Sequence, residues 1–140
     1  MNNQKRIGST TELRVMLAFI ELGYSVSSPY GDCERYDFIA DIDGRLLKVQ
    51  CKTARSSPNG NGFVIDVRRL RTSIIGYIRE TYGPGEIDFF ATCYEGRTYL
   101  IPAEECGTQK TLCTGERNGQ LRAEDYEIGA VLERIRRGKL

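Results

Sequence analysis

A two-residue turn, Asp43-Gly44, separates two segments in which apolar and polar residues alternate, 36–42 and 45–53. An Asp-Gly pair between alternating segments is a strong signal for a β-hairpin, because the tight turn needs a positive φ at both central positions. A two-residue turn also fixes the register, so that Asp37 faces Gln50 across the hairpin. The sequence therefore predicts both a hairpin and its pairing.

Alternation divides this hairpin into two faces. One face is apolar and is the predicted core face: Tyr36, Phe38, Ala40, Ile42, Leu47, Val49 and Cys51. The opposite face carries Asp37, Gln50 and Lys52 together. In the predicted register the Cβ atoms of Asp37 and Gln50 lie about 5 Å apart. The hairpin thus gathers a carboxylate, an amide and an ammonium group on one side.

Other segments supply helices and further strands around the hairpin. Helical spacing of Leu13, Met16, Leu17 and Ile20 predicts a helix over 9–22. Its expected start is a capping box from Ser9 to Glu12, and its expected end is Gly23. Helices are also predicted over 68–82 and 123–137, and strands over 24–27, 63–67, 87–94 and 97–101, whereas 106–118 stays ambiguous. This order predicts an α/β (mixed α+β) fold in a single domain spanning 1–140.

The composition excludes several catalytic classes. The sequence contains 0 histidines, so Ser-His, Cys-His and histidine-metal schemes are excluded. There is no GxxxxGK[ST] loop and no GxGxxG motif after a strand. The cysteines lack paired CxxC spacing, and an odd count of 5 without a secretion signal predicts reduced thiols and a cytoplasmic location.

Oxygen ligands and one lysine remain as candidates for chemistry. Asp37, Gln50 and Glu12 offer the ligand types that Mg²⁺ prefers, and Mn²⁺ can substitute for it. Such a metal polarises a phosphate and acidifies a bound water. Lys52 could orient that water or balance charge on the phosphate. Each residue also has a structural interpretation: Glu12 as a capping partner, Asp37 as a strand start and Lys52 as a surface residue. Their shared location favours the joint catalytic hypothesis.

This arrangement resembles the PD-(D/E)XK nuclease superfamily, in particular the small branch that includes a group I intron-encoded homing endonuclease. The resemblance covers the helix at 6–12, the hairpin at 36–53 and a later hairpin at 87–102. It implies a restriction-endonuclease-like core, with a central mixed β-sheet flanked by helices. Asp37 matches the central aspartate of the family, Lys52 its lysine, and Glu12 the helix glutamate of many members. Gln50 stands where most members carry Glu or Asp, and the homing branch is similar in accepting glutamine.

The implied function is that of a Mg²⁺-dependent endonuclease hydrolysing phosphodiester bonds in double-stranded DNA, of homing or restriction type. A Holliday-junction-type resolvase of branched DNA would use the same glutamate, aspartate and lysine. A catalytically inactive DNA-binding module of the same fold is the third hypothesis, and it is favoured by the neutral Gln50.

The charge distribution favours a polyanionic partner, because 45–79 holds eight basic residues and one acid. Candidates for phosphate contacts are Lys5, Arg6, Arg35, Lys48, Arg55, Arg68, Arg69 and Arg71, and candidates for base contacts are Tyr30, Asn59 and Asn61. For any single basic residue, an ordinary solvated position is the favoured interpretation. A homo-oligomer, dimer or tetramer, is expected, because two-fold symmetry would place two sites on one duplex. Neither a small-molecule cofactor nor a membrane partner is expected.

Overall fold

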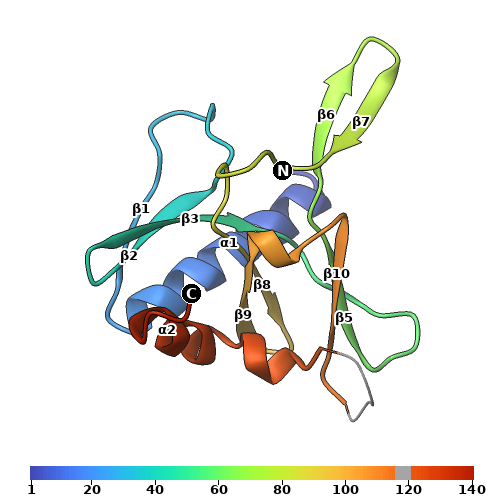
Figure 1. The fold of residues 1–140 in the computed structure, drawn as a ribbon. Helices are drawn as coiled ribbons and strands as arrows, with labels where there is room; N and C mark the ends of the chain where they lie inside the picture. The colour runs from blue at the N-terminus through green and yellow to red at the C-terminus, as the bar shows by residue number, and fades with distance from the viewer. Residues whose placement is uncertain (116–120) are drawn as a thin grey trace.

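The computed structural model describes residues 1–115 and 121–140, and its centre is a five-stranded mixed sheet (Figure 1). The strand order is β1-β2-β3-β8-β9, in which β3 and β8 run parallel and the other neighbours are antiparallel. The bounds are β1 Ser25–Ser27, β2 Phe38–Ile42, β3 Arg45–Cys51, β8 Phe89–Tyr94 and β9 Arg97–Pro102. A mixed sheet with helices confirms the predicted fold class.

The predicted hairpin forms between β2 and β3. Asp43 and Gly44 have φ values of 53° and 94°, and the register runs from Ile42↔Arg45 to Phe38↔Val49 as predicted. The ladder ends there, however. The Asp37 N–H donates to the Val49 carbonyl at 2.8 Å, so the predicted direct pairing with Gln50 is not formed. Asp37 therefore lies just beyond the regular part of the hairpin.

The helix α1 begins at Asn3 rather than Ser9 and ends at Glu21. The Asn2 side chain caps it by accepting a hydrogen bond from the Lys5 N–H at 2.9 Å. The predicted capping box is therefore wrong: Ser9 lies inside the helix, and Glu12 is two turns further on than a capping residue would be. Gly23, with a φ of 90°, follows the last turn as predicted.

The face of α1 that packs on the sheet differs from the predicted one. Thr11, Val15 and Phe19 are buried, whereas Leu13 is 66% exposed and Leu17 and Ile20 are also exposed. The helix is apolar on two sides, and both sides satisfy helical spacing. Only the fit against the sheet, where the rings of Phe19 and Phe38 meet edge to face at 5.7 Å, decides which side is buried.

The helix predicted over 68–82 is wrong, because this segment forms a hairpin of β6 (Arg69–Ser73) and β7 (Gly76–Glu80). The hairpin projects from the body of the molecule (Figure 1). Gly76 has a φ of 123° beside the turn, a conformation that a helix does not permit. The β-branched residues Thr72, Ile74, Ile75 and Ile78 also favour strands.

A three-stranded sheet, β10-β5-β4, covers part of the central sheet, with β4 at Arg55–Ser56, β5 at Gly62–Asp66 and β10 at Gln109–Cys113. The ambiguous segment 106–118 thus contains a strand, while its residues 116–118 lie outside the described part. The predicted C-terminal helix is divided into a 3-10 turn, Ala123–Tyr126, and α2, Ile128–Arg136. A further 3-10 turn spans Ala103–Glu105.

Two hydrophobic clusters lie against the central sheet. The first joins α1 and α2 to the predicted apolar face of the hairpin, including Phe38, Leu47 and Val49. The second contains Phe63, Phe90 and other residues of β5, β8, β9 and β10. Tyr36, which was predicted on the first face, packs against the second cluster because the ladder ends at Phe38. No described helix has the length and apolar character needed to cross a membrane.

Candidate active site

Asp37 directly precedes β2, and the backbone of the neighbouring strand β3 holds it at one end of these strands. The Cys51 N–H donates to its Oδ2 at 2.7 Å. Burial raises the pKa of Asp37 above its ordinary value, and the Cys51 N–H and the Lys52 charge offset this effect only in part. Asp37 is therefore a fixed carboxylate whose charge is incompletely compensated.

Glu12 comes to the same place from the middle of α1. Burial, and then repulsion from Asp37, raise the pKa of the Glu12 carboxyl group. In the described part of the chain its side chain has neither a hydrogen-bond partner nor an ion-pair partner. Two carboxylates from distant parts of the sequence thus share a partly desolvated location.

Lys52 follows β3 directly, and its N–H donates to the Ala91 carbonyl of β8 at 2.8 Å. Its Nζ donates to the Arg68 carbonyl at 3.0 Å and to the Tyr82 hydroxyl at 3.2 Å. Burial lowers the pKa of Lys52, while the charges of Asp37 and Asp66 raise it. Lys52 thus lies within the electrostatic influence of Asp37 but forms no ion pair with any described carboxylate.

Gln50 lies in β3, next to Cys51 and opposite Phe90 of β8. It is half-buried, and no described residue accepts from or donates to its carboxamide. The alternation of β3 places Gln50 on the same side as Lys48 and opposite to Val49. Its carboxamide is consequently available to a ligand.

The donors at this location fit a hard divalent cation. Glu12 and Asp37 supply carboxylate oxygens, and the Oδ1 of Asp37 has no partner among the described residues. The described residues include no group of three or more His, Cys, Asp or Glu side chains that could hold a metal. Mg²⁺ commonly uses only one or two carboxylates and retains several waters, so this small donor set suits it.

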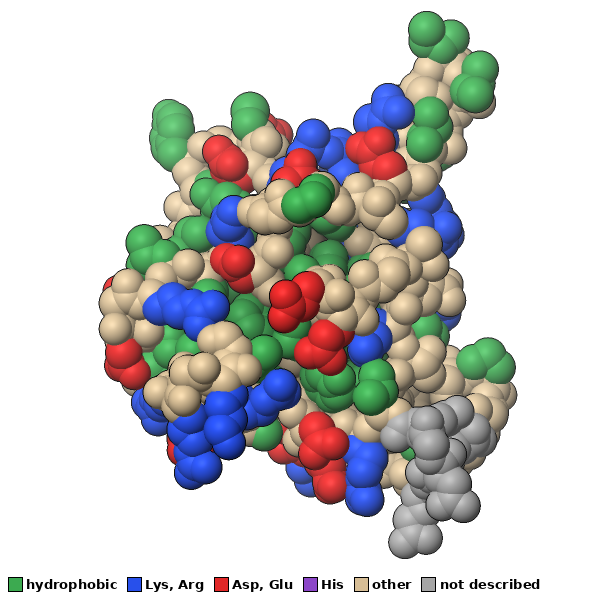
Figure 2. Space-filling model, viewed as in Figure 1, with side chains coloured by type: hydrophobic (Ala, Val, Ile, Leu, Met, Phe, Trp, Pro, Cys, Tyr) green, Lys and Arg blue, Asp and Glu red, His purple; other side chains and the backbone are tan. Residues whose placement is uncertain are grey.

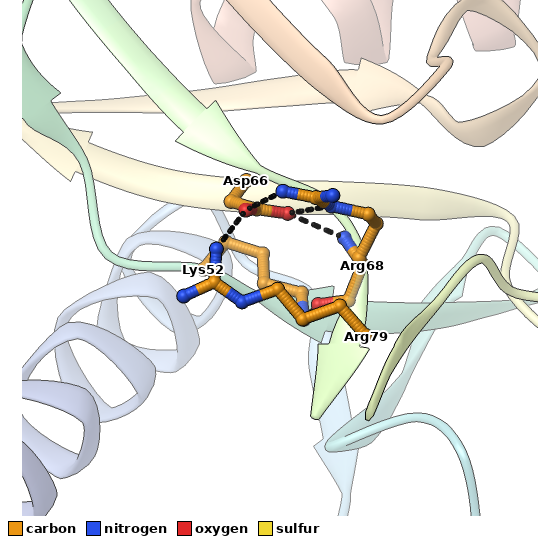
Figure 3. Close-up of polar contacts among 4 residues, drawn as sticks. All are labelled: Lys52, Asp66, Arg68 and Arg79. Carbon is orange, nitrogen blue, oxygen red and sulfur yellow. Dashed lines mark hydrogen bonds and ion pairs between the residues drawn. The ribbon is translucent and has the colours of Figure 1, made fainter. Parts of the chain in front are cut away.

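A network beside Lys52 was not predicted. Asp66, at the end of β5, accepts from the Arg68 backbone N–H and Nε at 3.0 Å each, from Arg68 Nη2 at 2.7 Å and from Arg79 Nη1 at 3.4 Å (Figure 3). Hydrogen bonds from Arg68 lower the pKa of Asp66 to about 2. Burial, followed by the Asp37 charge, raises the pKa of Tyr82 to about 12. The expectation of a helix over 68–82 concealed this network. In the observed hairpin, Arg68 and Arg79 both bond to Asp66.

The predicted DNA contacts are dispersed, and several are paired with acids. Arg68 pairs with Asp66, Arg69 and Arg71 pair with Glu80, and Arg35 lies 3.7 Å from Glu86. Basic and acidic side chains lie side by side at the base of the projecting hairpin (Figure 2).

The other predicted contacts have varied surroundings. Lys48 Nζ donates to the Gly85 carbonyl, and Asn59 Oδ1 accepts from Ser57 Oγ at 2.8 Å and from the Asn61 N–H at 3.0 Å. The remaining side chains are exposed: Lys5, Arg6, Tyr30 and Arg55.

Comparison with known proteins gives consistent matches. The sequence profile of the PD-(D/E)XK endonuclease family matches residues 2–128. Protein 5.3 of Escherichia phage T7 is 28% identical over 118 residues, which cover 84% of this chain and 96% of that protein. The bacterial homing endonuclease I-Ssp6803I has a similar structure, with a TM-score of 0.79, 28% identity and coverage of 99% of both chains.

The structural match confirms the restriction-endonuclease-like core, and the profile match spans nearly the whole sequence. The chain belongs to the PD-(D/E)XK endonuclease family.

Proposed function

We propose that the protein is a Mg²⁺-dependent endonuclease that hydrolyses phosphodiester bonds in double-stranded DNA, of homing or restriction type. The observation that carries this proposal is the convergence of Glu12, Asp37 and Lys52 at the end of β3. The match to I-Ssp6803I, which is described as a homing endonuclease, supports the proposal over the full length of the chain.

In this proposal Asp37, Glu12 and Gln50 hold the metal, and Mn²⁺ can replace Mg²⁺. The bound ion supplies a Lewis acid and a water of lowered pKa. The Cys51 N–H keeps Asp37 in place, and α1 fixes Glu12 beside it. The Lys52 ammonium stabilises the negative charge that develops on the phosphate during hydrolysis.

The partners follow from the same proposal. DNA phosphates would be contacted by the exposed basic residues around the site, and a homo-oligomer would bring a second site to the other strand. One nuclease domain spanning 1–140 and a cytoplasmic location stay predictions from the sequence.

Cleavage of DNA by purified protein tests the proposal. We expect cutting of duplex DNA in Mg²⁺ or Mn²⁺ and none in EDTA. Asp37→Ala should abolish cleavage without loss of folding, because no other residue can replace the carboxylate that Cys51 holds. Asp32→Ala, which removes an exposed carboxylate from the preceding loop, is the matched control and should cut normally. Circular dichroism verifies that each variant is folded.

The alternatives are separate outcomes of this assay. Selective cutting of four-way junctions would identify a resolvase. Intact duplex, branched and single-stranded DNA in both metals, together with retained DNA binding, would identify a non-catalytic binding module. Normal cutting by folded Asp37→Ala protein would contradict the assignment of the site.

A further inference from the structure

The β6–β7 hairpin joins the body of the protein through two residues that both contact Lys52. Arg68 directly precedes β6, and Tyr82 follows β7. We call these two residues the hairpin feet. The Lys52 ammonium donates to the backbone carbonyl of the first foot at 3.0 Å and to the hydroxyl of the second at 3.2 Å. Both ends of the hairpin therefore contact the lysine of the candidate site.

Core packing fixes the position of Tyr82. Its ring meets the buried Phe90 edge to face, with 5.4 Å between the centroids. Lys52 Nζ also lies 5.1 Å from the centroid of the Tyr82 ring, a distance that permits a cation–π interaction. Since the ring packs against Phe90, its hydroxyl oxygen is held in place as an acceptor for the ammonium.

Asp66 fixes the other acceptor. Its Oδ1 accepts from the Arg68 backbone N–H, and its two oxygens hold the Arg68 guanidinium. Val67, between these two residues, is 2% exposed and therefore anchored in the core. The local turn thereby sets the direction of the Arg68 carbonyl toward Lys52 (Figure 3). Arg79 of β7 contacts the same carboxylate and ties the second strand to the turn.

We propose that the hairpin feet position the Lys52 ammonium for the reaction, with the Tyr82 hydroxyl and the Arg68 carbonyl as its two acceptors. The proposal rests on the proposed nuclease function. A lysine has a flexible stem and three N–H donors, so its charge is poorly placed unless acceptors restrict it. The hairpin feet occupy two donors, and the third has no acceptor among the described residues. That third N–H is available to a phosphate oxygen or a water. Tyr82 is in this sense a positioning residue.

Tyr82→Phe tests this role because it removes the hydroxyl and retains the ring that packs on Phe90. At saturating DNA we expect turnover to fall roughly tenfold, the effect of losing one hydrogen bond to a charged group. DNA affinity in Ca²⁺ should not change, and the melting temperature should fall by no more than a few degrees. The control is Tyr94→Phe, because the Tyr94 hydroxyl bonds Ser56 Oγ at 2.9 Å, in a contact that does not involve Lys52.

Combining variants shows whether Tyr82 acts through Lys52. In a Lys52→Met background, Tyr82→Phe should cause no further loss, since the group that it positions is already absent. Unchanged turnover of Tyr82→Phe would overturn the proposal. A joint loss of turnover, DNA affinity and melting temperature would also overturn it, since that pattern indicates a general structural role.

A second measurement does not depend on cleavage. Proton–nitrogen correlation spectra of ¹⁵N-labelled lysine side chains should contain a slowly exchanging ammonium signal that Lys52→Met removes and Tyr82→Phe weakens. Absence of this protected signal would overturn the positioning role even in an active enzyme. A protected signal in a protein that cuts no DNA would instead contradict the proposed nuclease function, so the two failures are distinguishable.

Discussion

At the scale of single residues, Gln50 is the proposed metal ligand that departs from the pattern of the PD-(D/E)XK superfamily. The resemblance to the superfamily leads us to expect Glu or Asp at this position. A neutral carboxamide leaves Glu12 and Asp37 as the carboxylates available to a cation at the end of β3. The two already repel each other, so a third acid would increase the repulsion in the metal-free protein and the attraction for a cation.

Gln50→Glu should therefore tighten Mg²⁺ binding and preserve cleavage at lower Mg²⁺, because a carboxylate holds this cation better than an amide does. Gln50→Ala should weaken both Mg²⁺ binding and cleavage, though less than Asp37→Ala does. Calorimetric Mg²⁺ titration and metal-dependent cleavage measure the two effects, and Gln109→Ala on the exposed edge of β10 is the control. If Gln50 is only a surface polar residue, both changes should stay within about 0.5 kcal/mol in stability and activity. Identical Mg²⁺ titrations for wild type and Gln50→Ala would remove Gln50 from the site.

The raised pKa of Asp37 predicts a dependence of stability on pH in the absence of metal. Because burial raises the pKa of this carboxyl group, the folded state binds its proton more tightly than the unfolded state does. The stability that Asp37 contributes is fully present below its ordinary pKa of 3.8. This contribution is lost as the pH rises through the raised pKa of the folded state.

Asp37→Asn should consequently stabilise the metal-free protein at neutral pH, where wild type carries the buried charge. The amide oxygen can still accept the Cys51 hydrogen bond. Urea denaturation in EDTA, from below the ordinary aspartate pKa of 3.8 up to neutral pH, would show a shallower decline for the variant than for wild type. Saturating Mg²⁺ should reduce the difference by stabilising only wild type. A less stable Asp37→Asn protein at neutral pH would contradict the uncompensated charge, and Asp32→Asn controls for the loss of a surface carboxylate.

At the scale of elements, the β6–β7 hairpin combines charged strands with an apolar tip. Arg68 and Arg79 share Asp66, and Arg69 and Arg71 share Glu80. Each carboxylate thus serves two cations, which leaves positive charge in excess. Ion pairs of exposed side chains contribute little to stability, about 0–1 kcal/mol, so the exposed Arg71 can leave Glu80 at small cost.

Salt dependence tests whether the hairpin contacts DNA. Replacing Arg71 by Ala should reduce the slope of log affinity against log salt by about 0.9 if its guanidinium contacts one phosphate. Binding is measured in Ca²⁺ at several salt concentrations. Arg137→Ala is the matched control, since that arginine is also exposed and paired with an acid, Glu133. An unchanged slope for Arg71→Ala would show that Arg71 does not contact a DNA phosphate.

At the scale of the whole molecule, the candidate site lies where elements from different parts of the chain meet. Glu12 comes from α1, Asp37 and Lys52 from the ends of β2 and β3, and the hairpin feet from the two ends of the β6–β7 hairpin. The two hydrophobic clusters hold these elements against the central sheet. The geometry of the site therefore depends on packing across the molecule as well as on the local hairpin.

Local chemistry allowed part of this to be predicted from the sequence. The Asp43-Gly44 turn determined the register of β2 and β3, because few residues accept a positive φ at both positions. The register and alternation then located Asp37 and Lys52 near one end of the sheet. The same period of two predicted the buried positions Phe38, Leu47 and Val49.

Other features depended on contacts between distant residues. The side of α1 that is buried could not be predicted, because two apolar sides compete and only packing of Phe19 on Phe38 selects one. The segment 68–82 matched helical spacing, yet it pairs with itself as a hairpin, and contacts of its two ends with Lys52 and Phe90 hold that hairpin on the body of the protein. The sequence by itself thus determined the central hairpin and the identity of its charged residues. Only the tertiary structure brought Glu12 beside Asp37 and the hairpin feet to Lys52, because burial and pairing between distant segments outweigh local preference.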